Sequence, residues 1–150
     1  MTNEVIKELV SGPLPSATFD ESGEWLTIQI DAAQWKQLAT LLYNAPYHFD
    51  YLFCLTCVDW KTHFTTVYHL TSTCHRQAIV VKAKVDRNDP QIETVSDIWK
   101  TADFHEREVF DLFGVRFINH SDLRRLILTE DFEGYPLRKD FEDPVNMIKL

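Results

Sequence analysis

Residues 105–114, HEREVFDLFG, bring together side chains that can move protons, bind metal ions or form ion pairs. His105, Glu106, Glu108 and Asp111 carry titratable or ligating groups, and Arg107 carries a cation able to hold an anion. His105 and Glu108 are three residues apart, which suits a metal pair on a helix, but a third and a fourth ligand are not evident. The stretch is therefore either an active site or a set of charges that holds structure and partners together.

Cys54 and Cys57 have the C-x-x-C spacing of redox and zinc sites. The flanking residues favour a strand, in which residues three apart point to opposite faces and their Cα atoms lie roughly 10 Å apart. A disulfide requires Cα atoms within about 7 Å of each other. No second Cys/His pair stands at zinc-ribbon spacing. The sequence therefore predicts that both cysteines are structural core residues.

Hydrophobic periodicity predicts the elements that must position these side chains. We expect helices at residues 3–11, capped by Asn3, and at 31–44, strands at 25–30, 51–60, 64–70 and 78–85, and a last helix that begins at Thr94 or Ser96 and ends at Gly114. Residues 51–60 are apolar on both faces, which predicts a strand inside the sheet. The four Trp are expected to fill the core. The pattern predicts an α+β fold, a single two-layer domain with a mixed β-sheet and helices on one face.

The apolar stripe of the last helix places Glu106 at its edge. The stripe follows the i, i+3, i+4 recurrence and consists of Ile98, Trp99, Ala102, Val109, Phe110 and Phe113. A partly buried carboxylate needs a cation or several hydrogen-bond donors to remain charged. Arg124, Arg125 and Arg138 are the candidate cations for Glu106.

A neighbouring face of the same helix carries Asp103, Arg107 and Asp111, spaced i, i+4 and i+8. Side chains at this spacing are neighbours on a helix surface, so the pattern predicts ion pairs along the helix. The spacing explains these charges without assigning them any chemistry.

Length and composition exclude several classes of protein. The chain has 150 residues, 45% of them hydrophobic and 13% aromatic, which predicts one folded domain. Its net charge of −8 argues against a nucleic-acid partner, and its four glycines cannot form a dinucleotide or phosphate loop. No segment approaches the roughly 18 apolar residues of a membrane span, and MTNEVIKELV lacks the apolar core of a signal peptide. Three cysteines without a disulfide framework fit a reducing, cytosolic compartment, so we expect a soluble chain able to sit peripherally in a membrane complex.

Residues 120–144, HSDLRRLILTEDFEGYPLRKDFEDP, have neither helical nor strand periodicity. A solvated acidic tail is one interpretation of such a charged terminal run. Against it stand seven apolar residues, namely Leu123, Leu126, Ile127, Leu128, Phe132, Leu137 and Phe141. Two cationic pairs, Arg124–Arg125 and Arg138–Lys139, are separated by the turn-forming Gly134 and Pro136. We therefore divide the chain into an α+β globular domain at 1–119 and an extended C-terminal arm at 120–150 that docks on a partner.

Two stretches together resemble a known family. A-x-F-x-E-R-E-V-F-D-L-F-G-V-R-F at 102–117 is followed by H-S-D-L-R-R at 120–125 and F-E-G-Y-P-L-R-K-D-F at 132–141. This combination resembles the 30 kDa subunit family of respiratory complex I, which includes the C subunit of bacterial NADH–quinone oxidoreductase. A weaker likeness, through LTCVDW and VYHL, extends back to about residue 49.

The resemblance implies a set of structural and partner-docking positions rather than catalytic ones. On this chain they are Glu106, Arg107, Glu108, Asp111, Gly114, His120, Asp122, Leu123, Arg124, Arg125, Gly134, Pro136, Leu137, Arg138, Lys139, Asp140 and Phe141. Four residues depart from the usual family pattern, namely Phe104, Ser121, Tyr135 and Glu142. His105 falls at a position that the family leaves variable, which weakens the metal interpretation.

The function that the resemblance implies is structural. We expect a non-catalytic assembly subunit of the peripheral arm of a proton-translocating NADH–quinone oxidoreductase, docked on the 49 kDa-type (D-type) subunit. It would carry no flavin, iron–sulfur cluster or metal, bind no nucleic acid, have no direct membrane span, and lie on the cytoplasmic side of the bacterial inner membrane. One alternative is a homologous subunit of a membrane-bound hydrogenase or plastoquinone-type complex. Another is a free-standing thiol or metal enzyme that uses Cys54, Cys57, His105 and Glu108.

Overall fold

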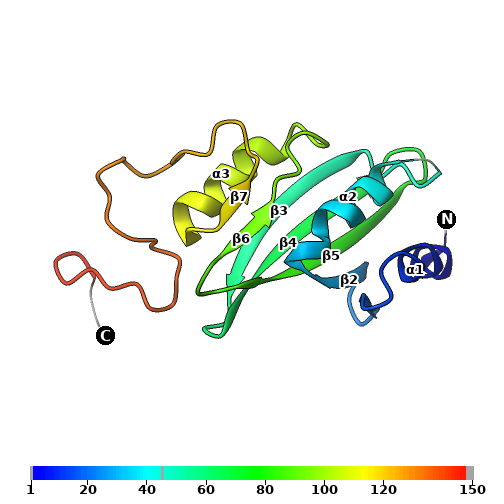
Figure 1. Ribbon diagram of the computed structural model, residues 1–150, viewed down its shortest axis with the longest axis horizontal. Coiled ribbons are helices and arrows are strands. Elements are labelled where there is room, and N and C mark those ends of the chain that lie inside the picture. Colours follow the sequence, from blue (N-terminus) through cyan, green and yellow to red (C-terminus); the bar gives the residue numbers. More distant parts are fainter. Residues whose placement is uncertain (1, 45, 148–150) are drawn as a thin grey trace.

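The computed structural model describes residues 2–44 and 46–147 and contains one main sheet (Figure 1). Its strands are β1 (Thr18–Asp20), β2 (Leu26–Asp31), β3 (Tyr51–Asp59), β4 (His63–Ser72) and β5 (Gln77–Asp86), in the spatial order β1-β2-β5-β4-β3. The β2–β5 pair is parallel and the other pairs are antiparallel, so the sheet is mixed. Two short strands, β6 (Gln91–Glu93) and β7 (Arg116–Ile118), form a separate parallel pair.

The helices cover one face of the main sheet. They are α1 (Asn3–Ser11), α2 (Trp35–Tyr43), which follows a 3-10 turn at Ala32–Gln34, and α3 (Ala102–Phe113). Phe64 and Tyr68, four residues apart on β4, point to the same side. Trp35 of α2 packs on Tyr68 with ring centroids 4.0 Å apart, and Phe113 of α3 contacts Phe64 at 6.3 Å. The predicted α+β fold, with a mixed sheet and helices on one face, is confirmed. We call the other side of the sheet its outer face.

Strand β3 lies at the edge of the sheet, so the prediction that residues 51–60 form an inner strand is wrong. The strand nonetheless carries apolar side chains on both faces. Leu52, Leu55 and Cys57 are buried on the inner face, while Phe53 and Val58 are half-buried. A bulge between Leu52 and Cys54 resets the alternation. Strand order depends on pairing between distant segments, and residue alternation does not encode it.

The last helix begins at Ala102, not at Thr94 or Ser96 as predicted. Residues 94–101 form turns instead, because their polar groups bind elsewhere in the chain. The hydroxyl of Thr94 and the N–H of Val95 donate to Glu106, and the carbonyl of Thr94 accepts from Lys36. Ile98 and Trp99 therefore pack from this turn segment and do not continue the stripe of α3.

Two smaller predictions also fail. Thr2, not Asn3, is at the N-cap of α1, and the Asn3 side-chain amide instead donates to Glu21 and accepts from Gln77. Trp35 and Trp99 are in the core as predicted, but Trp60 is 56% exposed. None of the helices in the described part of the chain is long and apolar enough to cross a membrane.

Beyond β7, residues 120–147 contain neither helix nor strand, and the last three residues of the predicted arm lie outside the described residues. We refer to residues 120–147 as the arm. Figure 1 shows that it runs from α3 to the end of the molecule opposite the N-terminus. Because it lacks a hydrogen-bonded ladder of its own, side-chain and backbone contacts to the rest of the chain must hold it in place.

Candidate partner-docking site

Helix α3 positions most of the charged residues that the sequence singles out. Glu106, Arg107 and Asp111 are buried on it, whereas Glu108 is exposed. Gly114 ends the helix in the left-handed conformation, with φ of 74°, and its N–H donates to the carbonyl of Phe110. A Cβ at Gly114 would lie 2.6 Å from the ring of Tyr135, so only glycine lets the arm approach this closely.

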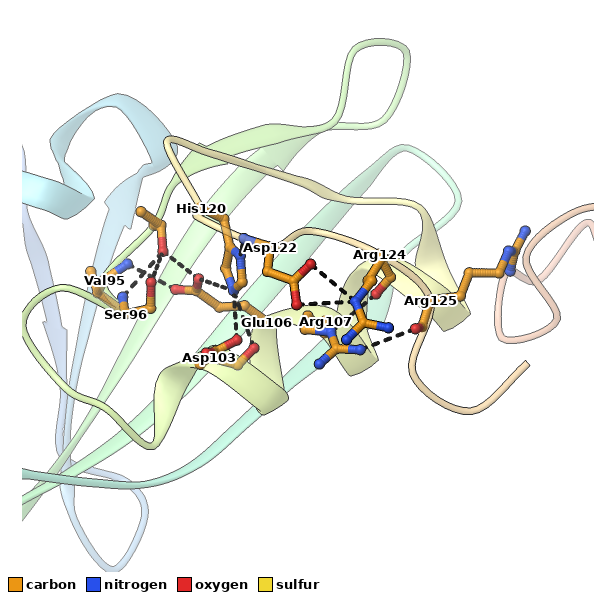
Figure 2. A network of polar contacts seen from close by, with 10 residues as sticks. Val95, Ser96, Asp103, Glu106, Arg107, His120, Asp122, Arg124 and Arg125 are labelled. Carbon is orange, nitrogen blue, oxygen red and sulfur yellow. Dashed lines mark hydrogen bonds and ion pairs between the residues drawn. The ribbon is translucent and has the colours of Figure 1, made fainter. Parts of the chain in front are cut away.

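Glu106 lies at the centre of a polar network between α3, the turn before it and the start of the arm (Figure 2). Its Oε2 accepts from the Thr94 hydroxyl at 2.5 Å, and its Oε1 accepts from the Val95 N–H at 2.8 Å. Nε2 of His120 is 3.8 Å from Oε2. Burial raises the pKa of Glu106 to about 7, and the two hydrogen bonds only partly oppose that rise.

The prediction that an arginine neutralises Glu106 is wrong. The three candidates bind elsewhere, Arg124 to Asp122, Arg125 to Asp111 and Arg138 to the carbonyl of Phe113. The stripe position indicated burial correctly, but a hydroxyl, a backbone N–H and a histidine supply the polar contacts. Hydroxyl and backbone donors leave no charge pattern in a sequence, so spacing could not have identified them.

His120 ties the first residue of the arm to α3. Its ring is fully buried, and its Nδ1 accepts from the N–H of Asp122 at 3.0 Å. That bond requires an unprotonated Nδ1, so the neutral ring carries its hydrogen on Nε2. Nε2 faces the Asp103 carbonyl at 3.3 Å and the Asp103 carboxylate at 3.2 Å (Figure 2). The Asp103 carboxylate therefore lies beside the first residue of the arm and does not pair with Arg107.

Arg107 also binds the arm. Its guanidinium donates to the carbonyls of Arg124 and Arg125, both at 3.2 Å. The predicted row of ion pairs along Asp103, Arg107 and Asp111 does not form. All three residues face the arm instead. Arg107 and Asp111 bind backbone groups of the arm, which need partners because the arm forms no helix or strand.

Asp111 holds the next segment of the arm. Its Oδ2 accepts from the consecutive N–H groups of Leu126, Ile127 and Leu128 at 3.1, 2.7 and 2.9 Å. Its Oδ1 accepts from Arg125 at 2.9 Å. Burial alone would raise the pKa of Asp111, but these donors outweigh burial and hold it below its usual value. Arg125 also donates to the carbonyls of residues 132 and 134, so its charge is bound within the chain.

Asp59, at the end of β3, anchors a second segment of the arm. It accepts two hydrogen bonds from Arg87 at 3.1 Å and one from the Lys139 N–H at 2.9 Å. Arg87 also forms an ion pair with Asp140 at 2.9 Å. Sequence reasoning missed Asp59, although it falls two residues after the buried Cys57, at a position where an inward-pointing acid needs a partner.

Residues 134–141 lie beside the C-terminal end of α3. The Leu137 N–H donates to the carbonyl of Leu112 at 3.1 Å, and the Arg138 guanidinium lies over the ring of Tyr135, 4.7 Å from its centroid. Gly134 has φ of 88°, and Phe141 stacks on Phe132 with centroids 6.1 Å apart. Pro136 is half-buried at the turn.

The remaining predicted residues lie at the surface. Glu108, Asp122, Lys139 and Asp140 are exposed, the side chain of Arg124 is 66% exposed, and Leu123 is half-buried. Large apolar side chains are exposed beside them, namely Phe104, Leu126, Ile127 and Leu137. The charges thus fix the arm from within, while these apolar side chains of α3 and the arm remain exposed. We call these four apolar residues, with Arg124, the α3–arm surface.

The cysteine and histidine candidates are not brought together. Both cysteines are free thiols on β3, the predicted strand. Cys57 is a core residue as predicted, but Cys54 is half-buried and does not belong to the core, so that part of the prediction is wrong. Burial raises the pKa of Cys57 to about 12. His105 and Glu108 lie on α3, and the described residues include no cluster of three or more His, Cys, Asp or Glu placed to hold a metal.

Comparison with known proteins shows similarity to subunits of respiratory complexes. The family model described as respiratory-chain NADH dehydrogenase, 30 Kd subunit, matches residues 28–145. The C subunit of NADH-quinone oxidoreductase from Roseiflexus sp. is 35% identical over 93% of this chain and 84% of the relative. The fused C/D subunit of the same enzyme from Phocaeicola vulgatus is 48% identical over 69% of this chain, and the match spans only 20% of that relative. A chain of the archaeal membrane-bound sulfane sulfur reductase superposes with a TM-score of 0.76 at 28% identity, covering 93% of this chain and 84% of the other.

Proposed function

Because this chain belongs to the 30 kDa subunit family of the respiratory-chain NADH dehydrogenase, we propose that it is a non-catalytic assembly subunit of a proton-translocating NADH–quinone oxidoreductase. In this proposal it docks on the 49 kDa-type (D-type) subunit and carries no cofactor of its own. It lies peripherally on the cytoplasmic side of the membrane.

The observation that carries the proposal is the use of charge within α3 and the arm. Glu106, Arg107 and Asp111 are buried and bound by groups of the same chain, so they are not open to a substrate. Their effect is to hold exposed apolar residues such as Ile127, which is 61% exposed, in a fixed arrangement. A preorganised apolar surface with a cation at its rim suits a protein partner, because little ordering cost remains to be met on binding.

The D-type subunit is the proposed partner because of the fused relatives. In Phocaeicola vulgatus the segment similar to this chain is one fifth of a polypeptide whose name joins the C and D subunits. Joining two chains into one polypeptide favours partners that already contact each other, since the linker then raises their effective concentration. By analogy, we infer that this chain and a D-type subunit are neighbours.

A matched pair of variants tests the docking role. Ile127→Asp places a charge in the α3–arm surface, whereas Val5→Asp places one at a comparably exposed apolar residue on α1. Each tagged variant is expressed in the native host and purified from detergent-solubilised membranes, and the associated subunits are identified by mass spectrometry. We expect Ile127→Asp to lose the D-type subunit and Val5→Asp to retain it. Wild-type chain that purifies without any respiratory subunit would contradict the proposal.

A second candidate rests on the likeness to the sulfane sulfur reductase chain. The same fold could serve a homologous complex whose electron donor or acceptor differs. Assaying the purified complex for NADH–quinone, hydrogenase and sulfur-reducing activity distinguishes the two candidates, since the docking role is common to both and only the redox partners change.

A further inference from the structure

The outer face of the main sheet carries aromatic and apolar side chains among its polar and charged ones. Trp25, Phe53 and His69 form a ring cluster across it, with centroids 5.7–6.0 Å apart. Val67 and Val80 lie on the same face and are buried among their neighbours. The solvated face of a sheet usually carries polar residues, so apolar side chains on it indicate a candidate interaction site.

A hollow of about 480 Å³ opens on this face. Its lining includes Val58, Thr65, Val67, Lys82 and Lys84. The two lysines are two residues apart on β5 and therefore point to the same side. Trp60, which is 56% exposed, lies at its rim, and Asp31 is the one acid among its lining residues.

The two lysines are cations on a chain that is acidic as a whole. The net charge is −8, and most Lys and Arg side chains are bound within the chain, as in the pairs of Arg87 with Asp59, Arg116 with Asp89 and Lys36 with Asp97. Among the described residues, neither ammonium group of Lys82 and Lys84 makes an ion pair or a hydrogen bond. With two such cations and one acid, Asp31, the lining of the hollow carries a net positive charge on an acidic molecule.

We propose that the outer face is a second docking surface of this chain, and that it binds an acidic segment of another subunit of the complex. Carboxylates of that segment pair with Lys82 and Lys84, and its apolar side chains fill the hollow over Val58 and Val67. The inference rests on the proposed function only in requiring that the chain works within a multisubunit complex. It assigns a surface separate from the α3–arm surface, because the hollow includes no residue of α3 or the arm.

Charge reversal tests the role of the lysines. Lys82→Glu with Lys84→Glu is compared with a control, Arg76→Glu with Lys100→Glu, which changes the net charge equally at exposed cations outside the hollow. Both double variants are purified as tagged full-length chains from native membranes. We expect at least about tenfold lower recovery of the partner subunit with the hollow variant than with the control, because like charges then face each other. Lys82→Gln with Lys84→Gln only removes the charges, so it should reduce recovery of the partner subunit less. It also controls for misfolding of the charge-reversed variant.

A photo-crosslinking amino acid at Thr65 identifies the occupant. In the intact wild-type complex we expect a crosslink to a partner-subunit peptide rich in Asp and Glu. A crosslink to lipid, to a second copy of this chain or to a neutral or basic peptide, or no crosslink at all, would overturn the inference, as would equal recovery with the two double variants. Failure of the wild-type chain to purify with any subunit would instead count against the proposed function, so the two failures are distinguishable.

Discussion

Three buried carboxylates of this chain differ in the number of donors that reach them. Asp59 accepts from the Arg87 guanidinium, which lowers its pKa most, and also from the N–H groups of Lys61 and Lys139. Asp111 accepts from three N–H groups and an arginine, and its pKa is also lowered. Glu106 has two uncharged donors, which do not offset its burial, so its pKa is raised to about 7. At the scale of single residues, donor count decides which acid stays ionised.

The raised pKa of Glu106 predicts that stability falls as the pH rises. Between its ordinary value of 4.5 and about 7, the folded chain holds a proton that the unfolded chain releases. Glu106 should therefore lower the free energy of unfolding by roughly 3 kcal/mol as the pH is raised through this window. Urea unfolding of wild type and Glu106→Gln from pH 4.5 to 8 measures the difference, with the exposed Glu108→Gln as control. Parallel profiles for wild type and Glu106→Gln would contradict this prediction.

The burial of Cys57 predicts selective labelling of the thiols. Because burial raises its pKa to about 12, the reactive thiolate is scarce at pH 8 and is shielded from solvent. Maleimide treatment of the folded chain followed by mass spectrometry should modify the exposed Cys74 readily and leave Cys57 unmodified until urea is added. Rapid labelling of Cys57 in the folded chain would mean that β3 opens or that the inner face is accessible.

At the scale of elements, sequence patterns predicted the local structure well and the partners of charged groups poorly. Alternation located β2 to β5, because inner-face residues such as Phe64 or Val81 are buried by a helix layer, but it missed the three-residue strands β1, β6 and β7. The same patterns did not reveal that β3 lies at an edge, or that Asp111 binds residues 125–128. Spacing along a helix tests only neighbours within one turn, and these contacts join residues more than a dozen positions apart.

Asp111 is predicted to be the main anchor between α3 and the arm. Asp111→Asn replaces a carboxylate oxygen with an N–H₂ group, which cannot accept from Arg125 and three backbone N–H groups together. Because the carboxylate is fully buried, we expect a loss on the order of 3 kcal/mol in the free energy of unfolding, measured by urea denaturation.

The exposed Asp122 provides a matched control for Asp111. It pairs with Arg124 at the surface, so Asp122→Asn should leave the urea midpoint close to that of wild type. Equal unfolding midpoints for the two variants would mean that the contacts of Asp111 do not hold the arm. Hydrogen exchange of the N–H groups at 126–128, faster in Asp111→Asn than in wild type, provides an independent measure.

At the scale of the whole molecule, the arm has one side that contacts the rest of the chain and one side that is exposed. Its inner side binds α3 and β3 through His120, Arg125, Arg138 and the N–H of Lys139. Asp140 binds Arg87 at the start of the loop after β5. Its outer side exposes Ile127 among the apolar residues of the α3–arm surface. The sequence motif therefore combines residues that fix the arm with residues that are free to meet a partner. A family resemblance identifies both kinds together, and only three-dimensional contacts separate them.

Residues 1–119 are predicted to depend on the arm for their stability. Deleting residues 120–150 would remove the Arg125 guanidinium and three backbone N–H groups from Asp111, and the Lys139 N–H from Asp59. It would also uncover the C-terminal end of α3. We expect the shortened chain to lose several kcal/mol of stability and to melt about 10 °C or more below the full chain. A chain ending at residue 142 keeps every anchor from His120 to Phe141 and should melt within a few degrees of the full chain. Thermal melting followed by circular dichroism compares the three. If the chain ending at 119 melts like the full chain, the arm is dispensable for folding, and its role is confined to the partner.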